Sequence, residues 1–485
     1  MNRFTPLLAF TLAFSFPLQA QDAPPPSDPA PAATPKEAQP KQTKDEAVPA
    51  ASESPAEEAA PAAEPAAESA APTKPADAAK DRVSLEEIRR FVSVFRAVKQ
   101  AYVDPVDDEA LMRSAIRGLL TDLDPHSAYL DQDESQALTE QASGAYDGLG
   151  LEVLQQPDRT LLVIAPIDDT PAARAGIKPG DVIVKIDGKP IDADSVDSAV
   201  DSMRGEPGTP ITLTVQRESS ADPIDFTLTR ETIRVSSVRA RSLDPGYAYV
   251  RISTFQADTG AEVQRKLKAL QGKGDKTLKG LVLDLRSNPG GLLNAAVEVA
   301  DAFLDEGVIV STKGRLSYAN AEYRARRGDL LLGAPIVILS DSGTASAAEV
   351  LAGALRDHKR ALVMGSASFG KGSVQTVLPM DNGDSIKVTT ARYYTPSGVS
   401  IQASGIAPDV LLPEDAELAS SGTRPPTLRE RDLPGHLRGD GEIEPGATVA
   451  VTPESSEELD DFAVREALNL LKGLSVFRKS VGQND

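Results

Sequence analysis

Two short segments of this 485-residue chain carry residue types that can perform nucleophilic chemistry. Ser346 lies in the small-residue segment 342–349, and Lys371 lies between two glycines 25 residues further along, with Gln375 four residues after it. A serine hydroxyl is a poor nucleophile at neutral pH and needs a base within hydrogen-bonding distance. None of the histidines lies in a glycine-rich segment of this kind; they are His126, His358 and His436. If the chain is a serine hydrolase, we therefore expect lysine to be the base.

A lysine can act as a base near pH 7 only if its pKa falls well below the usual value. The pKa must drop from about 10.4 by about three pH units, which costs the charged form about 4 kcal/mol. Burial of Lys371 would achieve this, and the glycines on both sides allow a backbone to approach closely. Gln375 would orient the Lys371 amine without restoring its charge. A carboxylate in the same place would raise the lysine pKa and favour the charged form. In this hypothesis Lys371 takes the proton of Ser346 Oγ and later returns it to the leaving amine.

Two strand-to-helix turns, at residues 284–291 and 339–346, supply backbone N–H groups at the start of a helix, where negative charge is favoured. A tetrahedral intermediate needs two such donors close to the nucleophile. Our candidates for this oxyanion hole are the amide of Ala347 and the amide of Gly290 or Gly291. The structural alternative is that the glycines only permit a tight turn and that Ser346 only caps a helix.

The elements around these residues alternate between strands and helices from about 246 to 412. Strands are expected at 247–252, 281–285 and 336–340, and helices at 258–270, 292–304 and 347–356. Such alternation predicts an α/β layer structure for a core spanning residues 231–412.

Residues 146–230 instead read as short strands separated by turns. The glycine-hydrophobic loop Gly148, Leu149, Gly150 and Leu151 runs into a strand, and a second signature follows in residues 173–186. A module of this kind can hold an extended peptide at a sheet edge while the loop amides bind its terminal carboxylate.

Residues 83–140 are expected to be helical. Ser84 and Glu87 form a capping box, and apolar residues then recur at helical spacing in a single stripe. The stripe consists of Ile88, Phe91, Phe95, Val98 and Tyr102. It could form a subunit seam or pack on Leu111, Ile116 and Leu120 in the next helix.

The composition of the two ends of the chain predicts a signal peptide, two linkers and a terminal helix. Residues 1–20 read as a secretory signal peptide, with an apolar run too short to span a bilayer. Residues 21–80 are almost wholly Ala, Pro and polar residues, which predicts a disordered linker. Residues 413–455 read as an acidic linker, and 456–485 as a C-terminal helix. After signal removal we expect no transmembrane segment.

The net charge and the lack of cysteine limit the classes of partner and site that we expect. A formal net charge of −21 argues against nucleic acid, and the absence of cysteine excludes disulfides and thiolate metal sites. His, Asp and Glu residues do not occur in pairs at the spacing typical of a metal site, so we expect neither a metal nor a cofactor.

Residues 148–151 together with 173–186 resemble a PDZ domain. The segments 343–349, 369–375 and 393–398 together resemble the C-terminal processing peptidases, also called tail-specific proteases, and the resemblance extends over residues 83–410, including 284–286 and 124–127. It implies a helical N-terminal assembly region, a PDZ domain and a protease core with a crotonase-like layer arrangement. It also implies that Ser346 and Lys371 form a catalytic dyad oriented by Gln375.

The resemblance further implies a periplasmic serine endopeptidase that captures proteins by non-polar C-termini, assembles into homo-oligomers and can depend on an adaptor or activator. Turnover of cell-envelope proteins is the expected role. Arg204 matches an arginine tied to gating by the PDZ domain in some relatives. At positions 399 and 348 this chain has Val399 and Ala348, where many members of the family have an arginine and a serine. We expect these differences to affect fine specificity and not the dyad.

Two alternatives remain. The chain could be a catalytically silent PDZ scaffold, against which the intact Ser346, Lys371 and Gln375 argue. A trypsin-like PDZ protease is disfavoured because the PDZ domain precedes the core and no His-then-Asp pair precedes a serine there.

Overall fold

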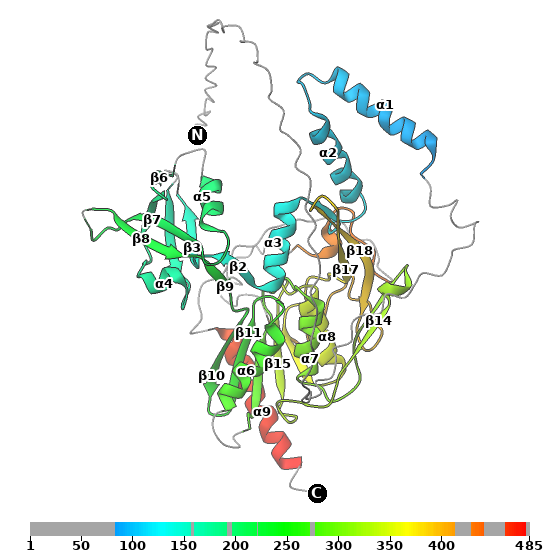
Figure 1. The fold of residues 1–485 in the computed structure, drawn as a ribbon. Coiled ribbons are helices and arrows are strands. Elements are labelled where there is room, and N and C mark those ends of the chain that lie inside the picture. Colours follow the sequence, from blue (N-terminus) through cyan, green and yellow to red (C-terminus); the bar gives the residue numbers. More distant parts are fainter. Residues whose placement is uncertain are drawn as a thin grey trace, which may run out of the picture. The chain divides into compact units, whose positions relative to one another are not determined.

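The computed structural model describes residues 83–156, 160–191, 196–220, 222–271, 277–412, 428–440 and 461–481 (Figure 1). The predicted signal peptide and the predicted linker at 21–80 lie outside these residues, as do 413–427 and 441–460 of the predicted acidic linker and C-terminal helix. None of the helices within the described ranges is both long and apolar enough to cross a membrane.

The N-terminal part begins with helices whose first turns are capped by polar side chains. The elements are α1 (Leu85–Ala101), α2 (Asp108–Thr121), β1 (Ala128–Leu130) and α3 (Gln132–Ser143). Ser84 Oγ accepts the Glu87 amide over 3.2 Å, which is one half of the predicted capping box. Asp107 caps α2 in the same way, and Asp131 and Glu134 form a reciprocal capping box at α3.

The predicted apolar stripe lies on α1, and most of it faces solvent. Ile88, Phe91, Val98 and Tyr102 are 39–59% exposed, and α1 has no buried residue. The stripe therefore does not pack into a local core with the second helix.

The PDZ-like module is an antiparallel sheet with strand order β3-β4-β5-β7-β8, and β6 pairs with β5. Its elements are β3 (Leu151–Gln155), β4 (Leu161–Pro166), α4 (Pro171–Ala175), β5 (Val182–Ile186), β6 (Lys189–Pro190), α5 (Val196–Met203), β7 (Pro210–Gln216) and β8 (Ile224–Thr229). Inward side chains such as Leu161, Ile183 and Leu213 form its core. The strands β2 (Ala145–Gly148) and β9 (Glu231–Arg234) pair with each other at the two ends of the module.

The central sheet of the core has the order β10-β11-β12-β15-β16-β19 and is parallel from β11 onward. These strands are β10 (Val238–Asp244), β11 (Tyr247–Ile252), β12 (Gly280–Asp284), β15 (Ile336–Ser340), β16 (Ala361–Gly365) and β19 (Val410–Leu411). The strands and helices expected here by alternation are present, with boundaries shifted by a few residues. The expected α/β layer organisation is therefore confirmed.

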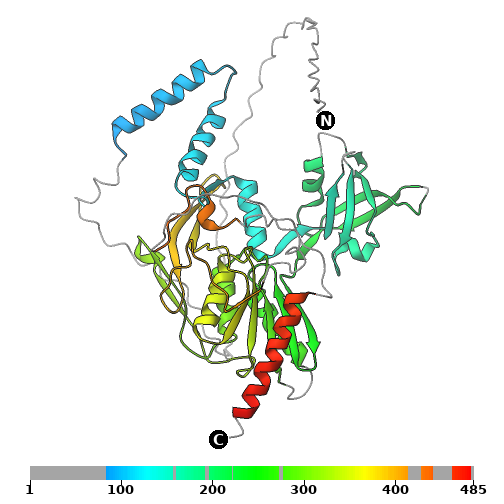
Figure 2. The ribbon, with the colours of Figure 1, turned by 180° about the vertical axis from the view of Figure 1, so that it is seen from behind.

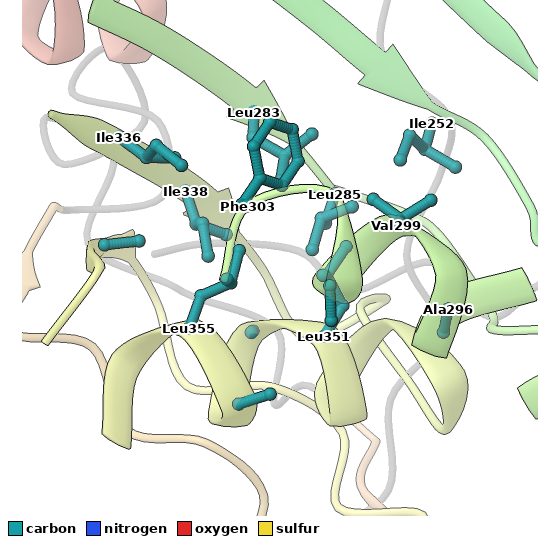
Figure 3. Close-up of a cluster of buried hydrophobic side chains, with 14 of the residues drawn as sticks. Ile252, Leu283, Leu285, Ala296, Val299, Phe303, Ile336, Ile338, Leu351 and Leu355 are labelled. Carbon is teal, nitrogen blue, oxygen red and sulfur yellow. The ribbon is translucent and has the colours of Figure 1, made fainter. Parts of the chain in front are cut away.

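Helices cover both faces of this sheet because successive strand residues point to opposite sides. Leu281, Leu283, Ile336 and Ile338 pack toward α6 (Thr259–Gln271), α7 (Leu293–Asp301) and α8 (Ala347–Asp357), a layer that Figure 3 shows in part. The intervening residues Val282, Val337 and Leu339 pack toward α9 (Phe462–Val481), which runs along the other face (Figure 2). Such continuous apolar strands are typical of a sheet that is buried on both sides.

A second, antiparallel sheet has the order β1-β18-β13-β14, and β17 also pairs with β18. Its further elements are β13 (Val308–Gly314), the short 3-10 helix η1 (Ser317–Ala319), β14 (Ala321–Arg324), β17 (Ser373–Pro379) and β18 (Ser385–Tyr394). Lys371 lies just before β17, so this sheet fixes the loop that carries it.

Residues 428–440, inside the predicted acidic linker, are folded and contain the 3-10 helix η3 (Glu430–Asp432). Their contacts are described below.

Candidate active site

Ser346 lies at the junction between the turn after β15 and the start of α8, where parallel strands end and helices begin. Its backbone has φ 54° and ψ −117°, a conformation that a non-glycine residue rarely adopts, and its exposed fraction is 7%. Strain of this kind is held in place only by surrounding structure and is concentrated at functional sites. Here the neighbouring turn supplies that support, since Ala345 N donates to Asn288 O over 2.9 Å and Thr344 Oγ1 donates to Leu285 O over 2.8 Å.

The turn at 288–291 lies directly against Ser346. A Cβ atom added to Gly290 would lie 2.8 Å from Ser346 Cβ and 3.0 Å from Ala347 N, so only glycine fits without displacement. The Gly290 amide, however, donates to Asn288 Oδ1 over 2.9 Å. Ala347 is the first residue of α8, where an amide has no partner in the helix. The amides of Ala347 and Gly291 are therefore the better candidates for an oxyanion hole.

Glu349 joins the serine segment to the lysine segment. Its carboxylate is 0% exposed and accepts four hydrogen bonds: Oε2 from Ser346 N (2.7 Å) and Lys371 N (2.9 Å), Oε1 from Ser368 Oγ (2.5 Å) and Gly370 N (2.8 Å). Burial raises the pKa of Glu349 to about 7, and these bonds offset part of the rise. The role of Glu349 was not predicted from the sequence; the signal that could have indicated it is an acidic residue three positions after a serine at the start of a helix.

Lys371 is partly buried, and its pKa is lowered, chiefly by burial, which disfavours the charged ammonium. The nearby Lys387 lowers it further, whereas the carboxylates of Glu430, Glu349 and Asp124 oppose the shift. Within the described part of the chain, no hydrogen bond joins the Lys371 amine to the Ser346 hydroxyl; the two segments meet through Glu349.

Gln375 lies on β17, just after a bulge at Val374. Its Nε2 donates to Ser373 Oγ over 3.0 Å and to Thr389 Oγ1 over 3.2 Å. No hydrogen bond to Lys371 is formed among the residues described, so the structure brings Gln375 together with β18 rather than with the amine.

Tyr393 is a further neighbour of the nucleophile that sequence analysis did not single out. Its side chain is buried on β18, and its hydroxyl lies near enough to the Ser346 side chain for the serine to oppose part of the rise in its pKa. Burial raises the pKa of Tyr393 to about 12, so the hydroxyl keeps its proton at neutral pH.

The loop Gly148–Leu151 precedes β3, which lies at the edge of the PDZ sheet and thus offers a strand for peptide addition. Leu149 is part of the module's core, and Gly150 has φ 77° with Thr170 Cβ only 2.4 Å from where its own Cβ would be. Arg204 bonds Glu140 at the end of α3, and its guanidinium carbon lies 5.7 Å from the ring centre of Tyr146. Arg204 therefore contacts residues outside the PDZ sheet.

The histidines lie in separate places: His126 bonds Glu430, His358 bonds the Val308 carbonyl and His436 bonds the Leu433 carbonyl. Across the ranges that the structure describes, no group of three or more His, Asp and Glu residues is arranged to hold a metal ion.

Comparisons with known proteins agree with this organisation. Residues 246–412 match the model for peptidase family S41, residues 162–217 match a PDZ domain, and residues 51–134 match the N-terminal domain of the activating protease CtpB. These matches bear out the predicted PDZ domain and protease core.

The curated relatives point the same way. The chain is 44% identical over 391 residues to a carboxy-terminal-processing protease of Bartonella bacilliformis, covering 80% of this chain and 89% of the relative. It is 35% identical to the carboxy-terminal processing protease CtpA of Bacillus subtilis, covering 67% and 69%. The solved photosystem II D1 C-terminal processing protease is 34% identical, with coverage of 68% of this chain and 94% of that one and a TM-score of 0.39.

The resemblance stated from the motifs is thus confirmed by independent similarity over most of the chain. With its S41 core, its PDZ domain and relatives that align over most of their own length, the chain belongs to the family of carboxy-terminal processing proteases.

Proposed function

We propose that this protein is a serine endopeptidase that uses Ser346 as nucleophile and Lys371 as general base. The observation that carries the proposal is the shared carboxylate of Glu349, which holds the backbone of both residues at once. The strained conformation of Ser346 and the lowered pKa of Lys371 support the same assignment.

The reaction follows from these positions. Lys371, when neutral, takes the Ser346 proton as Oγ attacks the scissile carbonyl, and the oxyanion is stabilised by the amides of Ala347 and Gly291. Lys371 then protonates the leaving amine. A water molecule next attacks the acyl-enzyme while Lys371 takes its proton, and Lys371 returns this proton to Ser346 Oγ. Gln375 acts only after the Lys371 amine moves within reach of its Oε1, the acceptor of the side chain, while its Nε2 donates to Ser373 and Thr389.

We further propose that the PDZ domain captures substrates by a non-polar C-terminus. The edge strand β3 would pair with the peptide backbone, and the amides of the Gly148–Leu151 loop would bind the terminal carboxylate. A periplasmic location, turnover of envelope proteins, homo-oligomers and an adaptor or activator belong to the same proposal and rest on the predicted signal peptide and the family.

A resting state is part of the proposal, because the amine and the hydroxyl are not bonded to each other. A substrate tail or a partner would then shift the equilibrium toward a state in which they meet. The contact of Arg204 with Glu140 and Tyr146 is the proposed point of control.

Cleavage of β-casein by the purified Ser346→Ala variant tests the assignment. We expect a loss of at least about 10⁴-fold with an unchanged melting temperature, while Ser342→Ala in the preceding turn keeps wild-type activity. Wild-type rates in Ser346→Ala would refute the proposal. Peptide binding by a wild-type protein that never cleaves, even with activating tails, would favour the silent PDZ scaffold.

A further inference from the structure

Glu430 is a buried carboxylate with no place in the reaction described above. It lies in η3, in the 428–440 segment, and its exposed fraction is 0%. Its oxygens bond His126 Nε2 over 2.8 and 3.0 Å, and Oε1 accepts Gln402 Nε2 over 2.9 Å. Burying a charge is costly unless it is paired and hydrogen-bonded, so these partners help to keep the segment in place.

The same contacts reach the loop that carries Lys371, from both sides. Glu430 N donates to Phe369 O over 3.2 Å, two residues before the lysine. Gln402, 1% exposed, accepts Gly372 N over 2.9 Å through its Oε1 while its Nε2 holds Glu430. A Cβ atom on Gly372 would lie 2.2 Å from Gln402 N, so this close approach requires the glycine.

His126, the partner of Glu430, lies in a turn that is attached to the antiparallel sheet. Asp124 Oδ1 accepts the amides of His126 and Ser127 over 2.8 Å each, and Ser127 Oγ accepts Thr389 N on β18 over 3.2 Å. Since β18 pairs with β17, the strand that follows Lys371, the contacts close a ring around the lysine loop.

We propose that the 428–440 segment completes the catalytic site and that Glu430 is a positioning residue for the Lys371 loop. This inference rests on the proposed role of Lys371 as base. Glu430 has two separable effects: it anchors the loop through Gln402 and Phe369, and its negative charge stabilises the lysine ammonium.

The charges that face Lys371 allow the second effect to be assigned a sign. Glu430 on η3 is the first of the carboxylates that raise the lysine pKa, followed by Glu349 on α8 and Asp124 before β1, whereas Lys387 on β18 lowers it. Removing the Glu430 charge therefore lets the pKa of Lys371 fall further, and the base becomes available at lower pH.

The test compares Glu430→Gln and Glu430→Ala in the full-length chain. A glutamine at position 430 can accept a hydrogen bond from Gln402 and donate one to a neutral His126. It therefore keeps both side-chain contacts of Glu430 and loses only the negative charge, whereas alanine loses the contacts and the charge. The readout is the pH dependence of kcat and KM for a quenched fluorescent peptide with a non-polar C-terminus, and Arg431→Ala, an exposed change in the same 3-10 helix, is the control.

For Glu430→Gln we expect the acidic limb of the profile to move to lower pH, with a plateau kcat within about threefold of wild type. For Glu430→Ala we expect plateau kcat to fall about tenfold or more with KM unchanged. Arg431→Ala should match wild type. Melting curves identify a variant that has unfolded, and Glu430→Gln remains informative if alanine is not tolerated.

An unshifted acidic limb in Glu430→Gln overturns the inference, whether or not alanine lowers kcat, because a merely structural role would not touch the lysine pKa. Retained plateau kcat in a folded Glu430→Ala also overturns it. The proposed function fails by a different result, full activity of Ser346→Ala or Lys371→Met, so the two failures can be told apart.

Discussion

The backbone amides of Ser346 and Lys371 donate to the same atom, Oε2 of Glu349, over 2.7 and 2.9 Å. Residues that are 25 positions apart are thereby held by a side chain of the helix that follows the serine. Glu349 therefore sets the backbone geometry of the site.

Glu349→Gln should lower plateau kcat about 10–100-fold. An amide replaces one acceptor oxygen by an NH₂ group that faces backbone or hydroxyl donors, which leaves buried donors unpaired. Peptide cleavage measured beside Glu306→Gln, an exposed control, checks this. Equal rates in the two variants would contradict the role of Glu349.

The same variant should alter the pH dependence of stability. The pKa of Glu349 is raised by burial from 4.5 to about 7, so its contribution to stability is complete below about 4.5 and is lost as pH rises through about 7. Chemical denaturation at several pH values should show this decline in the wild type and a flatter curve in Glu349→Gln. Parallel curves would mean that the carboxyl titrates normally.

Lys371→Met should lower kcat about 10²–10⁴-fold, because the base is removed while the volume is nearly kept. The wild-type rate should rise with pH through the lowered lysine pKa. The burial that lowers this pKa also makes wild-type stability rise with pH from the folded value up to about 10.5, and the methionine variant lacks this slope.

Denaturation and cleavage assays of Lys371→Met beside Lys268→Met, an exposed change on α6, would test both statements. A profile unchanged in Lys371→Met would exclude the lysine as the titrating group.

Gly150→Ala should destabilise the PDZ module more than Gly176→Ala. Both glycines have positive φ, 77° and 85°, so alanine costs each about 1–2 kcal/mol of backbone strain. Only at Gly150 would the new Cβ lie 2.4 Å from Thr170, whereas nothing lies within 4 Å at Gly176. Thermal unfolding and binding of a peptide with a non-polar C-terminus measure the difference; equal losses would show that the Thr170 contact yields without cost.

Ile88→Asp should reduce the molar mass measured by light scattering. The α1 stripe is exposed in the single chain, and a charge in its centre would oppose burial of Phe91 and its neighbours against a second copy. Arg96→Asp, which alters charge on the same helix without touching the stripe, should keep the wild-type mass. An Ile88→Asp variant of unchanged mass would place the seam elsewhere.

The sequence was sufficient to predict candidate residues for the chemistry. A serine at a strand-to-helix turn, a lysine between glycines and the scarcity of histidine are properties of residue type and spacing, and they pointed to Ser346 and Lys371 without a fold. The alternation of apolar strands and amphipathic helices predicted the core, because periodicity reflects which face is buried.

The sequence did not reveal how these parts are joined. Nothing in the sequence linked Glu349 to the lysine loop, although the Lys371 amide donates to its carboxylate, and Glu430 lay in a stretch whose composition indicated a linker. Composition describes averages over a segment, whereas residues 428–440 are attached by particular contacts: the Glu430 carboxylate with His126 and Gln402, and the Leu437 carbonyl with Gln402.

By itself the sequence predicted which residues could react, since the intrinsic nucleophilicity of a side chain and the backbone freedom of glycine are properties of residue type. Only the tertiary structure decided what surrounds them: which carboxylates face the lysine, which amide of the glycine turn is already occupied, and which segment closes the ring around residues 369–372. The reason is physical, because burial and hydrogen-bond partners come from contacts between residues far apart in the chain, such as His126 and Glu430.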